Sequence, residues 1–145
     1  MTYRGLPSPS VKVGGIVYFG RMLEKIRANA RGELSADYQP NLGKGFDKLC
    51  VRFLNLIYGE LVERVKAGGS DEEILEWCFA KGRRLSNDEI HVWNEFMRKC
   101  GWNDALTEKL IFRKQEAGMT ERDDIQTMFE FIDADEGRSL SRSKA

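Results

Sequence analysis

The sequence has 145 residues, the size of one ordinary globular domain. Hydrophobic residues make up 41% of it and charged residues 32%, and the 23 basic and 23 acidic side chains cancel to a formal net charge of zero. This composition excludes an intrinsically disordered chain, which needs fewer hydrophobic residues and a charge imbalance. It also argues against a dedicated nucleic-acid-binding protein, whose surface is strongly basic.

The first ten residues predict an extended arm, because Pro7 and Pro9 disfavour a helix. Apolar residues then recur at spacings of three and four, the pattern of an amphipathic helix that Gly32 ends. They are Ile16, Phe19, Leu23, Ile26 and Ala30. Residues 33–45 predict a loop that is long enough to be a candidate functional loop, and Tyr38 is its only aromatic residue.

A second helix is expected to run from about Asp47 to Gly68 and Gly69. Its apolar residues cover so much of its circumference that we expect it at the centre of the fold. They are Leu49, Phe53, Leu54, Leu56, Ile57, Leu61, Val62 and Val65.

Two capping boxes mark the N-termini of the next two predicted helices. Ser70 has Glu73 three residues later, and Ser86 has Glu89 at the same spacing. In this motif each side chain accepts a hydrogen bond from the other residue's backbone N–H, which satisfies two donors at the start of a helix. Both sites therefore predict helix starts from local chemistry alone.

Two further helices are expected before the C-terminus. Asn103 is a candidate cap for a fifth helix that ends near Gly118, and Thr120 is one for a sixth that ends before Gly137. No segment shows the alternation of a useful strand. We therefore predict an all-α fold.

The expected architecture is a single compact domain of about six helices, packed as an orthogonal or irregular bundle over residues 11–137. An extended arm over residues 1–10 precedes it, and a flexible basic tail over residues 138–145 follows it.

The sequence favours a cytoplasmic location. No secretory signal is evident, and the longest apolar run near the front has four residues, whereas a membrane-spanning helix needs about 20. Cys50, Cys78 and Cys100 are an odd set without close spacing, which is typical of buried thiols in a reducing compartment. Cys100 follows two basic residues and is the best alternative candidate for a reactive thiol.

Charge is distributed unevenly along the chain. Residues 1–32 contain six basic and one acidic side chain, a net charge of +5. Residues 119–137 contain one basic and seven acidic side chains, a net charge of −6, and residues 138–145 return +3. The net neutrality is therefore a cancellation between oppositely charged ends.

Short motifs spread over the chain carry a family resemblance. They are Ser8-Pro9, Gly14-Gly15-Ile16, Arg21-Met22, Lys25-Ile26-Arg27, Gly32, Asp47, Trp93-Asn94 and Asp135-Glu136-Gly137-Arg138. This pattern resembles a family of short bacterial proteins known only as a domain of unknown function. The resemblance implies a small helical protein of unassigned role, and it implies no activity, cofactor or catalytic residue.

The first predicted helix contains a candidate anion-binding site. Arg21 and Lys25 lie one turn apart on the face opposite the apolar stripe, and Gly14 and Gly15 precede them. Glycines at a helix N-terminus let an anion approach the backbone N–H groups, where the helix dipole favours negative charge. No phosphate-loop or dinucleotide-binding motif is present, and no cofactor is predicted.

The simpler interpretation of these cations is ion pairing. We expect the acidic end of the last helix to fold back onto the first helix, so that its carboxylates pair with Arg21, Lys25 or Arg27. The candidate acidic partners are Asp47, Asp133, Asp135 and Glu136.

Two weaker site hypotheses remain. His91, the only histidine, has Glu95 one turn later and would suit a metal site, although a solvated helix face is the simpler interpretation. Tyr38 and Trp102 are candidates for the rim of a pocket, and Trp102 would otherwise pack against the Gly101 cap.

Two functions follow from these observations. The first is a partner-binding or regulatory module whose oppositely charged ends form an interface with an unknown protein or a second copy, or an intramolecular clamp. The second is a small-molecule or anion-binding enzyme that uses the region of Gly14, Gly15, Arg21 and Lys25. The sequence leaves open whether the chain is an enzyme, and it predicts no membrane partner.

Overall fold

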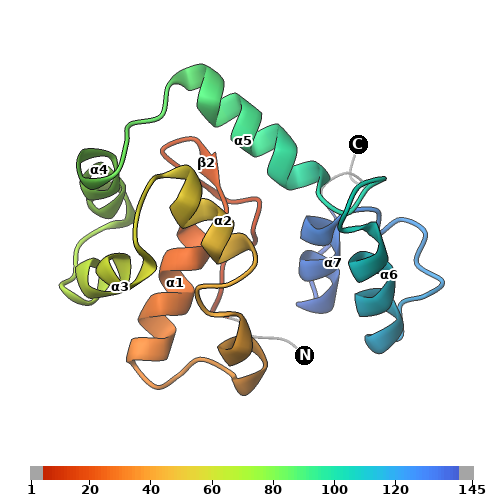
Figure 1. Cartoon of the computed structure of the whole chain (residues 1–145). Coiled ribbons are helices and arrows are strands. Elements are labelled where there is room, and N and C mark those ends of the chain that lie inside the picture. Colours follow the sequence, from red (N-terminus) through yellow and green to blue (C-terminus); the bar gives the residue numbers. More distant parts are fainter. Residues whose placement is uncertain (1–4, 141–145) are drawn as a thin grey trace.

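The computed structural model describes residues 5–140 and shows one mostly helical domain (Figure 1). This range contains seven α-helices, one 3-10 helix and a short hairpin, so the expected count of about six helices is too low. The helices are α1 (Phe19–Ala30), η1 (Ala36–Asn41), α2 (Phe46–Phe53), α3 (Tyr58–Lys66), α4 (Asp71–Lys81), α5 (Asn87–Lys99), α6 (Thr107–Glu116) and α7 (Met128–Asp135).

A hairpin replaces the first turns of the predicted first helix. Strands β1 (Lys12–Val13) and β2 (Ile16–Val17) pair antiparallel, and Gly14 and Gly15 form the turn between them with positive φ angles. The expectation of no strands is therefore wrong at this point. Ile16 matches a helical apolar stripe by spacing, but glycine pairs with positive φ favour a two-residue hairpin turn.

The predicted second helix is broken into α2 and α3. The break centres on Asn55, whose φ is 60°, a left-handed conformation that ends a helix. Arg83, distant in the sequence, holds this break: its backbone N–H donates to Leu54 O and its side chain donates to Phe53 O at 2.8 Å. Tertiary hydrogen bonds thus override an apolar pattern that is continuous in the sequence.

The two predicted capping boxes form as expected. Ser70 and Ser86 each accept a hydrogen bond from the backbone of the glutamate three residues later, and each glutamate accepts one from the serine backbone. They start α4 and α5 at the predicted positions.

The starts of the last two helices differ from the prediction. Asn103 does not cap α6, whose first flanking residue is Leu106. Helix α7 starts seven residues later than Thr120 suggests, because a complete capping box lies at Thr127 and Glu130. The same sequence motif that marks Ser70 and Ser86 also marks Thr127.

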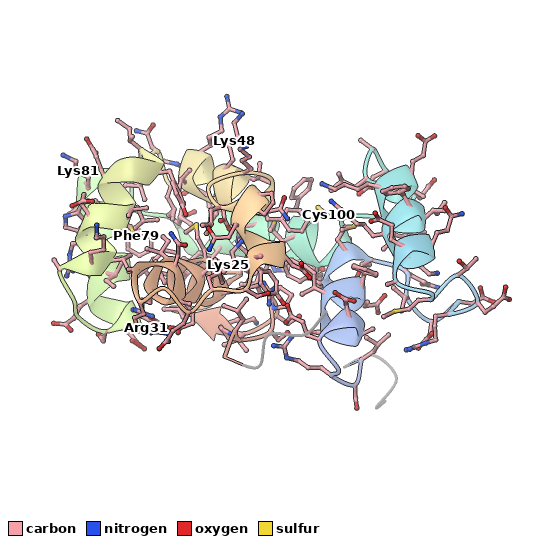
Figure 2. All side chains as sticks on the ribbon, turned by 90° about the horizontal axis from the view of Figure 1, so that it is seen from below. Lys25, Arg31, Lys48, Phe79, Lys81 and Cys100 are labelled. Carbon is pink, nitrogen blue, oxygen red and sulfur yellow. The ribbon has the colours of Figure 1, made fainter. Side chains whose placement is uncertain are left out.

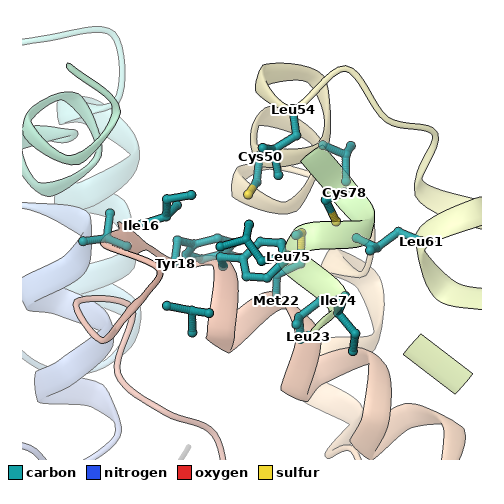
Figure 3. Packing of buried hydrophobic residues seen from close by; sticks show 14 of the residues in the cluster. Ile16, Tyr18, Met22, Leu23, Cys50, Leu54, Leu61, Ile74, Leu75 and Cys78 are labelled. Carbon is teal, nitrogen blue, oxygen red and sulfur yellow. The ribbon is translucent and has the colours of Figure 1, made fainter. Parts of the chain in front are cut away.

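The helices form two groups joined by α5. The largest core cluster lies among α1, α2, α3, α4 and the hairpin, and Figure 3 shows its side chains around Met22, Ile74 and Cys78. A smaller cluster joins α6 and α7 through Leu110 and Phe131. Helix α5 crosses from the first group to the second, with contacts to β2 and to α7 (Figure 1).

The described parts of the predicted arm and tail pack onto this body. Leu6 and Pro9 are buried, and so is Leu140. The rest of the predicted arm and tail, residues 1–4 and 141–145, lies outside the described part of the chain.

Within residues 5–140, none of the helices combines the length and the hydropathy that a membrane span requires.

Candidate functional site

The two oppositely charged ends of the chain meet in space. Arg21 of α1 forms a two-pronged ion pair with Glu136, directly after α7, with N–O distances of 2.9 and 2.5 Å. The side chains are 5% and 3% exposed, so the pair is buried rather than solvated. Its geometry matches the planar fork that makes arginine–carboxylate pairs strong.

Further groups complete the surroundings of Glu136. The Tyr38 hydroxyl donates to Glu136 Oε2 at 2.8 Å, and Arg138 donates to Glu136 Oε1 at 2.7 Å. Burial acts to raise the pKa of Glu136, but the hydrogen bond and charge of Arg21 outweigh it and hold that pKa below its usual range. This carboxylate is therefore ionised and fully engaged at neutral pH.

Arg21 and Arg138 also tie the N-terminal segment to this cluster. Arg21 donates to Pro7 O at 3.0 Å, and Arg138 donates to Leu6 O at 2.6 Å. Arg138 bonds in addition to Asp133 at 3.1 Å. The cluster thus joins α1, α7 and residues 6–7.

Lys25 belongs to a second buried network. Its ammonium lies 2.8 Å from Asp47 Oδ1 and 3.1 Å from the Tyr18 hydroxyl, which itself donates to the same carboxylate oxygen at 2.6 Å. The backbone N–H of Gly43 donates to Asp47 Oδ2 at 3.0 Å. Figure 2 shows Lys25 within the body of the molecule, whereas Lys48 lies at its edge.

Burial perturbs both partners of Asp47. It raises the pKa of Tyr18 well above the ordinary value, and the negative charge of Asp47 acts in the same direction. Burial lowers the pKa of Lys25, and Asp47 offsets part of that effect. Tyr18 is therefore a neutral hydrogen-bond donor, and Lys25 depends on Asp47 to remain charged.

Tyr18 also has an unusual backbone. Its φ is 73° and its ψ is −27°, in the left-handed region, where a bulky residue is rare. The conformation lies at the junction of β2 and α1 and directs the phenol toward Asp47. Backbone outliers of this kind cluster at functional sites, and they persist only where the surrounding structure holds them in place.

Both networks line one cleft between the two helix groups. The cleft has a volume of about 870 Å³, and its walls come from α1, η1 and α2 on one side and from α6 and α7 on the other. Tyr18, Arg21, Lys25, Tyr38 and Glu136 all contribute to its lining. The rest of the lining combines charged side chains with a group of apolar ones, which are Phe46, Leu49, Leu106, Met128, Phe131 and Ile132.

The structure does not bring the predicted glycines to this cleft. Gly14 packs against Leu75, and the Gly15 carbonyl accepts a hydrogen bond from Asn94. They lie in the hairpin turn, before Tyr18 and not at the first turn of α1. The four residues of the predicted anion site therefore do not converge, and only Arg21 and Lys25 line the cleft.

The predicted acidic partners separate into distinct roles. Asp47 pairs with Lys25, Glu136 with Arg21 and Asp133 with Arg138. Asp135 lines the cleft.

Arg27, the third predicted basic partner, pairs instead with Asp71 of α4 at 2.7 Å. The folding back of α7 onto α1 thus involves Arg21 alone among the three expected cations.

The structure places His91 of the metal hypothesis and Trp102 of the pocket-rim hypothesis on the surface of the molecule. His91 is exposed, and Glu95 pairs with Arg98 and Lys99 on the same helix face. No group of three potential metal-ligating side chains occurs in the part of the chain that the structure describes. Trp102 is 59% exposed and does not line the cleft.

The cysteines are all buried and unpaired by disulfides. Burial raises the pKa of Cys78 to about 12 and that of Cys100 to about 11. Because the thiolate is the nucleophile, neither thiol is activated at neutral pH.

Several cleft residues have no signal in the sequence. These residues are Lys44, Phe46, Lys109 and Arg113. The sequence pattern does not indicate that they line a common cleft, because α2 and α6 are brought together only by tertiary packing. Tyr18 shares a helix face with Arg21 and Lys25 by spacing, but its left-handed backbone has no such signal.

Comparison with known proteins gives a family. A family model described as a domain of unknown function (DUF5069) matches residues 4–138. The chain belongs to this family. The resemblance expected from the sequence motifs is thereby confirmed, and a search among curated proteins finds no match.

The DUF5069 match covers both halves of the cleft. It extends from before the hairpin to Arg138, so the two charged networks and the α6 and α7 wall lie within one family domain. The family description assigns no activity.

Proposed function

We propose that this DUF5069 chain binds a small organic molecule in the cleft between α1, η1 and α2 and α6 and α7. The observation that carries the proposal is the convergence of two buried polar networks on one cleft of about 870 Å³, whose lining combines apolar and charged side chains. Ligand sites have volumes of about 300 to 1,000 Å³ and combine an apolar lining with a few fixed polar groups.

The two networks support binding because they hold the walls rigid. Glu136 has its oxygens engaged by Arg21, Tyr38 and Arg138, so the end of α7 has a fixed position against α1. Asp47 fixes the start of α2 against α1 in the same way. A wall fixed before the ligand arrives reduces the conformational entropy lost on binding.

The left-handed Tyr18 is a second support. A non-glycine residue in this region costs about 1 to 2 kcal/mol, which the fold accepts here at the wall of the cleft. Its ring packs edge-on against Phe46, another lining residue, with centroids 5.6 Å apart.

The charged residues on which the partner-binding hypothesis depends are largely unavailable to a partner in this structure. It rests on oppositely charged ends, yet Arg21, Lys25 and Glu136 are paired within the chain and buried. These distances favour its intramolecular form, a clamp between α1 and α7. Light scattering from low to high salt tests the interface form, which requires an association that salt weakens.

The proposal is tested by filling the cleft. Ala117 is exposed and lines the cleft at the end of α6, so Ala117→Trp places a large ring in the space for a ligand. Ala80→Trp, at an exposed position near the end of α4, is the matched control. A small-molecule library is screened against all three proteins by saturation-transfer NMR.

We expect ligands that bind the native protein and Ala80→Trp and that Ala117→Trp does not bind. Equal binding to all three proteins contradicts the proposal, and so does the absence of any ligand.

A further inference from the structure

Two cationic side chains of the cleft lining lie outside the ion pairs among residues 5–140. Its lining has five cationic side chains and four acidic ones. Three of the cations have acidic partners: Arg21 pairs with Glu136, Lys25 with Asp47 and Arg113 with Glu116.

Lys44 and Lys109 are the cations left over. Neither has an ion pair with any residue from 5 to 140, and both are exposed at the cleft. They come from opposite walls, Lys44 from the segment before α2 and Lys109 from α6. Of the acidic side chains in the lining that belong to none of these three pairs, Asp37 is exposed and Asp135 is partly buried.

Apolar surface lies in the same cleft. Phe46, Leu49 and Leu106 are only partly buried, so part of each side chain still faces water. On α7, Ile132 is also partly buried and continues this surface, whereas Met128 and Phe131 are each only 8% exposed and pack in the core cluster of α6 and α7. Covering these atoms with an apolar ligand group would remove them from water at a free-energy gain.

We infer that the ligand of this cleft is an amphipathic organic anion, with an aromatic or aliphatic body on the apolar wall and a negative group neutralised by Lys44 and Lys109. This inference rests on the proposed function and narrows it to a ligand class. The charged group is a carboxylate, sulfonate or phosphate, since each carries negative charge and presents acceptor oxygens to the lysine ammonium groups. Arg21 and Lys25 do not take part, because their carboxylate partners already satisfy them.

Two fluorescent probes with nearly the same aromatic body separate the contributions. Anilinonaphthalene sulfonate is an amphipathic anion, whereas N-phenylnaphthylamine lacks the sulfonate and is neutral. Both become fluorescent in an apolar environment, so the Kd of each is measured by titration with the folded protein. Circular dichroism shows that each variant keeps its fold.

The lysines are tested as a pair. We expect the native protein to bind the sulfonate about tenfold more tightly than the neutral probe, which corresponds to about 1.4 kcal/mol. Lys44→Gln with Lys109→Gln should remove that difference and leave the Kd of the neutral probe unchanged. Lys12→Gln with Lys48→Gln removes the same charge at exposed positions outside the cleft lining and should preserve the difference.

The outcomes distinguish this inference from the proposed function. Equal affinity for the two probes, or a preference that the Lys44 and Lys109 variant retains, overturns the inference while cleft binding stands. An equal loss in the Lys12 and Lys48 control also overturns it, because the preference would then come from overall charge. If neither probe binds, or if Ala117→Trp leaves both Kd values unchanged, the cleft does not bind this class of ligand and the inference falls with the proposed site.

Discussion

Single residues carry the unusual chemistry of this chain. Asp47 is fully buried and accepts hydrogen bonds from the Tyr18 hydroxyl, the Lys25 ammonium and the Gly43 backbone. A buried carboxylate with three donors is stable only while they are present. Its neighbours in turn depend on it, since burial acts against the charge of Lys25.

The first prediction concerns this dependence. Asp47→Asn removes the counter-charge of a buried lysine, and breaking such a pair costs about 3 to 5 kcal/mol. We expect a fall of that size in the free energy of unfolding, measured by urea titration with circular dichroism. The double variant Lys25→Met, Asp47→Asn removes both charges and should lose less than the sum of the two single variants. Strict additivity would show that the two side chains are not coupled.

A second residue-scale prediction compares two glycines. A Cβ on Gly82 would lie 2.0 Å from Leu54 O and 2.9 Å from Asn55 O, whereas a Cβ on Gly59 would meet nothing within 4 Å. Gly82→Ala should therefore destabilise the fold by about 3 kcal/mol, because the backbone of the α2–α3 break would have to move. Gly59→Ala, inside α3, should stabilise it by about 0.5 to 1 kcal/mol. Thermal unfolding of both variants checks the opposite signs, and a stable Gly82→Ala protein would contradict the close approach at this break.

At the scale of elements, some helix ends are fixed by local caps and others by long-range hydrogen bonds. Helices α4, α5 and α7 each begin with a capping box, which needs only two residues three positions apart. Helices α1, α2, α3 and α6 have no side-chain cap bond, and the end of α2 is held by hydrogen bonds from the distant Arg83. The boxes of α4 and α5 gave correct predicted starts, whereas the box of α7 at Thr127 was missed in favour of Thr120.

The third prediction tests the cap of α7. Thr127→Ala removes a hydroxyl that accepts from the Glu130 N–H, and losing such a cap costs about 1 kcal/mol. Because α7 provides one wall of the cleft, we expect faster hydrogen exchange in its first turn. Ser70→Ala is the matched control, since it should lose a similar free energy while exchange in α7 stays unchanged. Equal exchange in α7 for both variants would show that this cap does not stabilise the wall.

At the scale of the whole molecule, the chain is closed by a contact between its ends. Arg21 and Glu136 are separated by 115 positions, and their ion pair joins the larger helix group to the end of α7. With Arg138 bonded to Leu6 O, the first and last described segments are linked directly. The opposite net charges of the two ends are thereby used inside the molecule.

The fourth prediction is a pH dependence that this contact creates. The pKa of Glu136 is lowered in the folded state from an unfolded value of about 4.5, so the folded state favours the ionised form. The stabilisation is therefore present above about pH 4.5 and is lost as the pH falls through the lower folded value. We expect urea unfolding at decreasing pH to show a steeper loss of stability in the native protein than in Glu136→Gln. Parallel pH profiles would show that Glu136 ionisation does not support the fold.

Much of the architecture follows from sequence pattern. Local residue patterns, within a few positions of one another, determine the helical content, the apolar stripes of the helices and the starts of α4 and α5. Even the missed start of α7 is a local signal, because Thr127 and Glu130 form the same box as Ser70 and Glu73. The uneven charge of the two ends was also visible, and it correctly indicated a contact between the first and last helices through Arg21 and Glu136.

What the sequence determined by itself is thus a mostly helical domain with opposite charges at its ends and the capped starts of α4 and α5. Tertiary structure alone decided the break at Asn55, the left-handed Tyr18, the pairing of Lys25 with Asp47 and the cleft that their networks line. The physical reason is range. Capping and amphipathic spacing act over a few residues, whereas burial and ion pairing depend on which distant segment supplies the partner, and that is defined only when the helices pack.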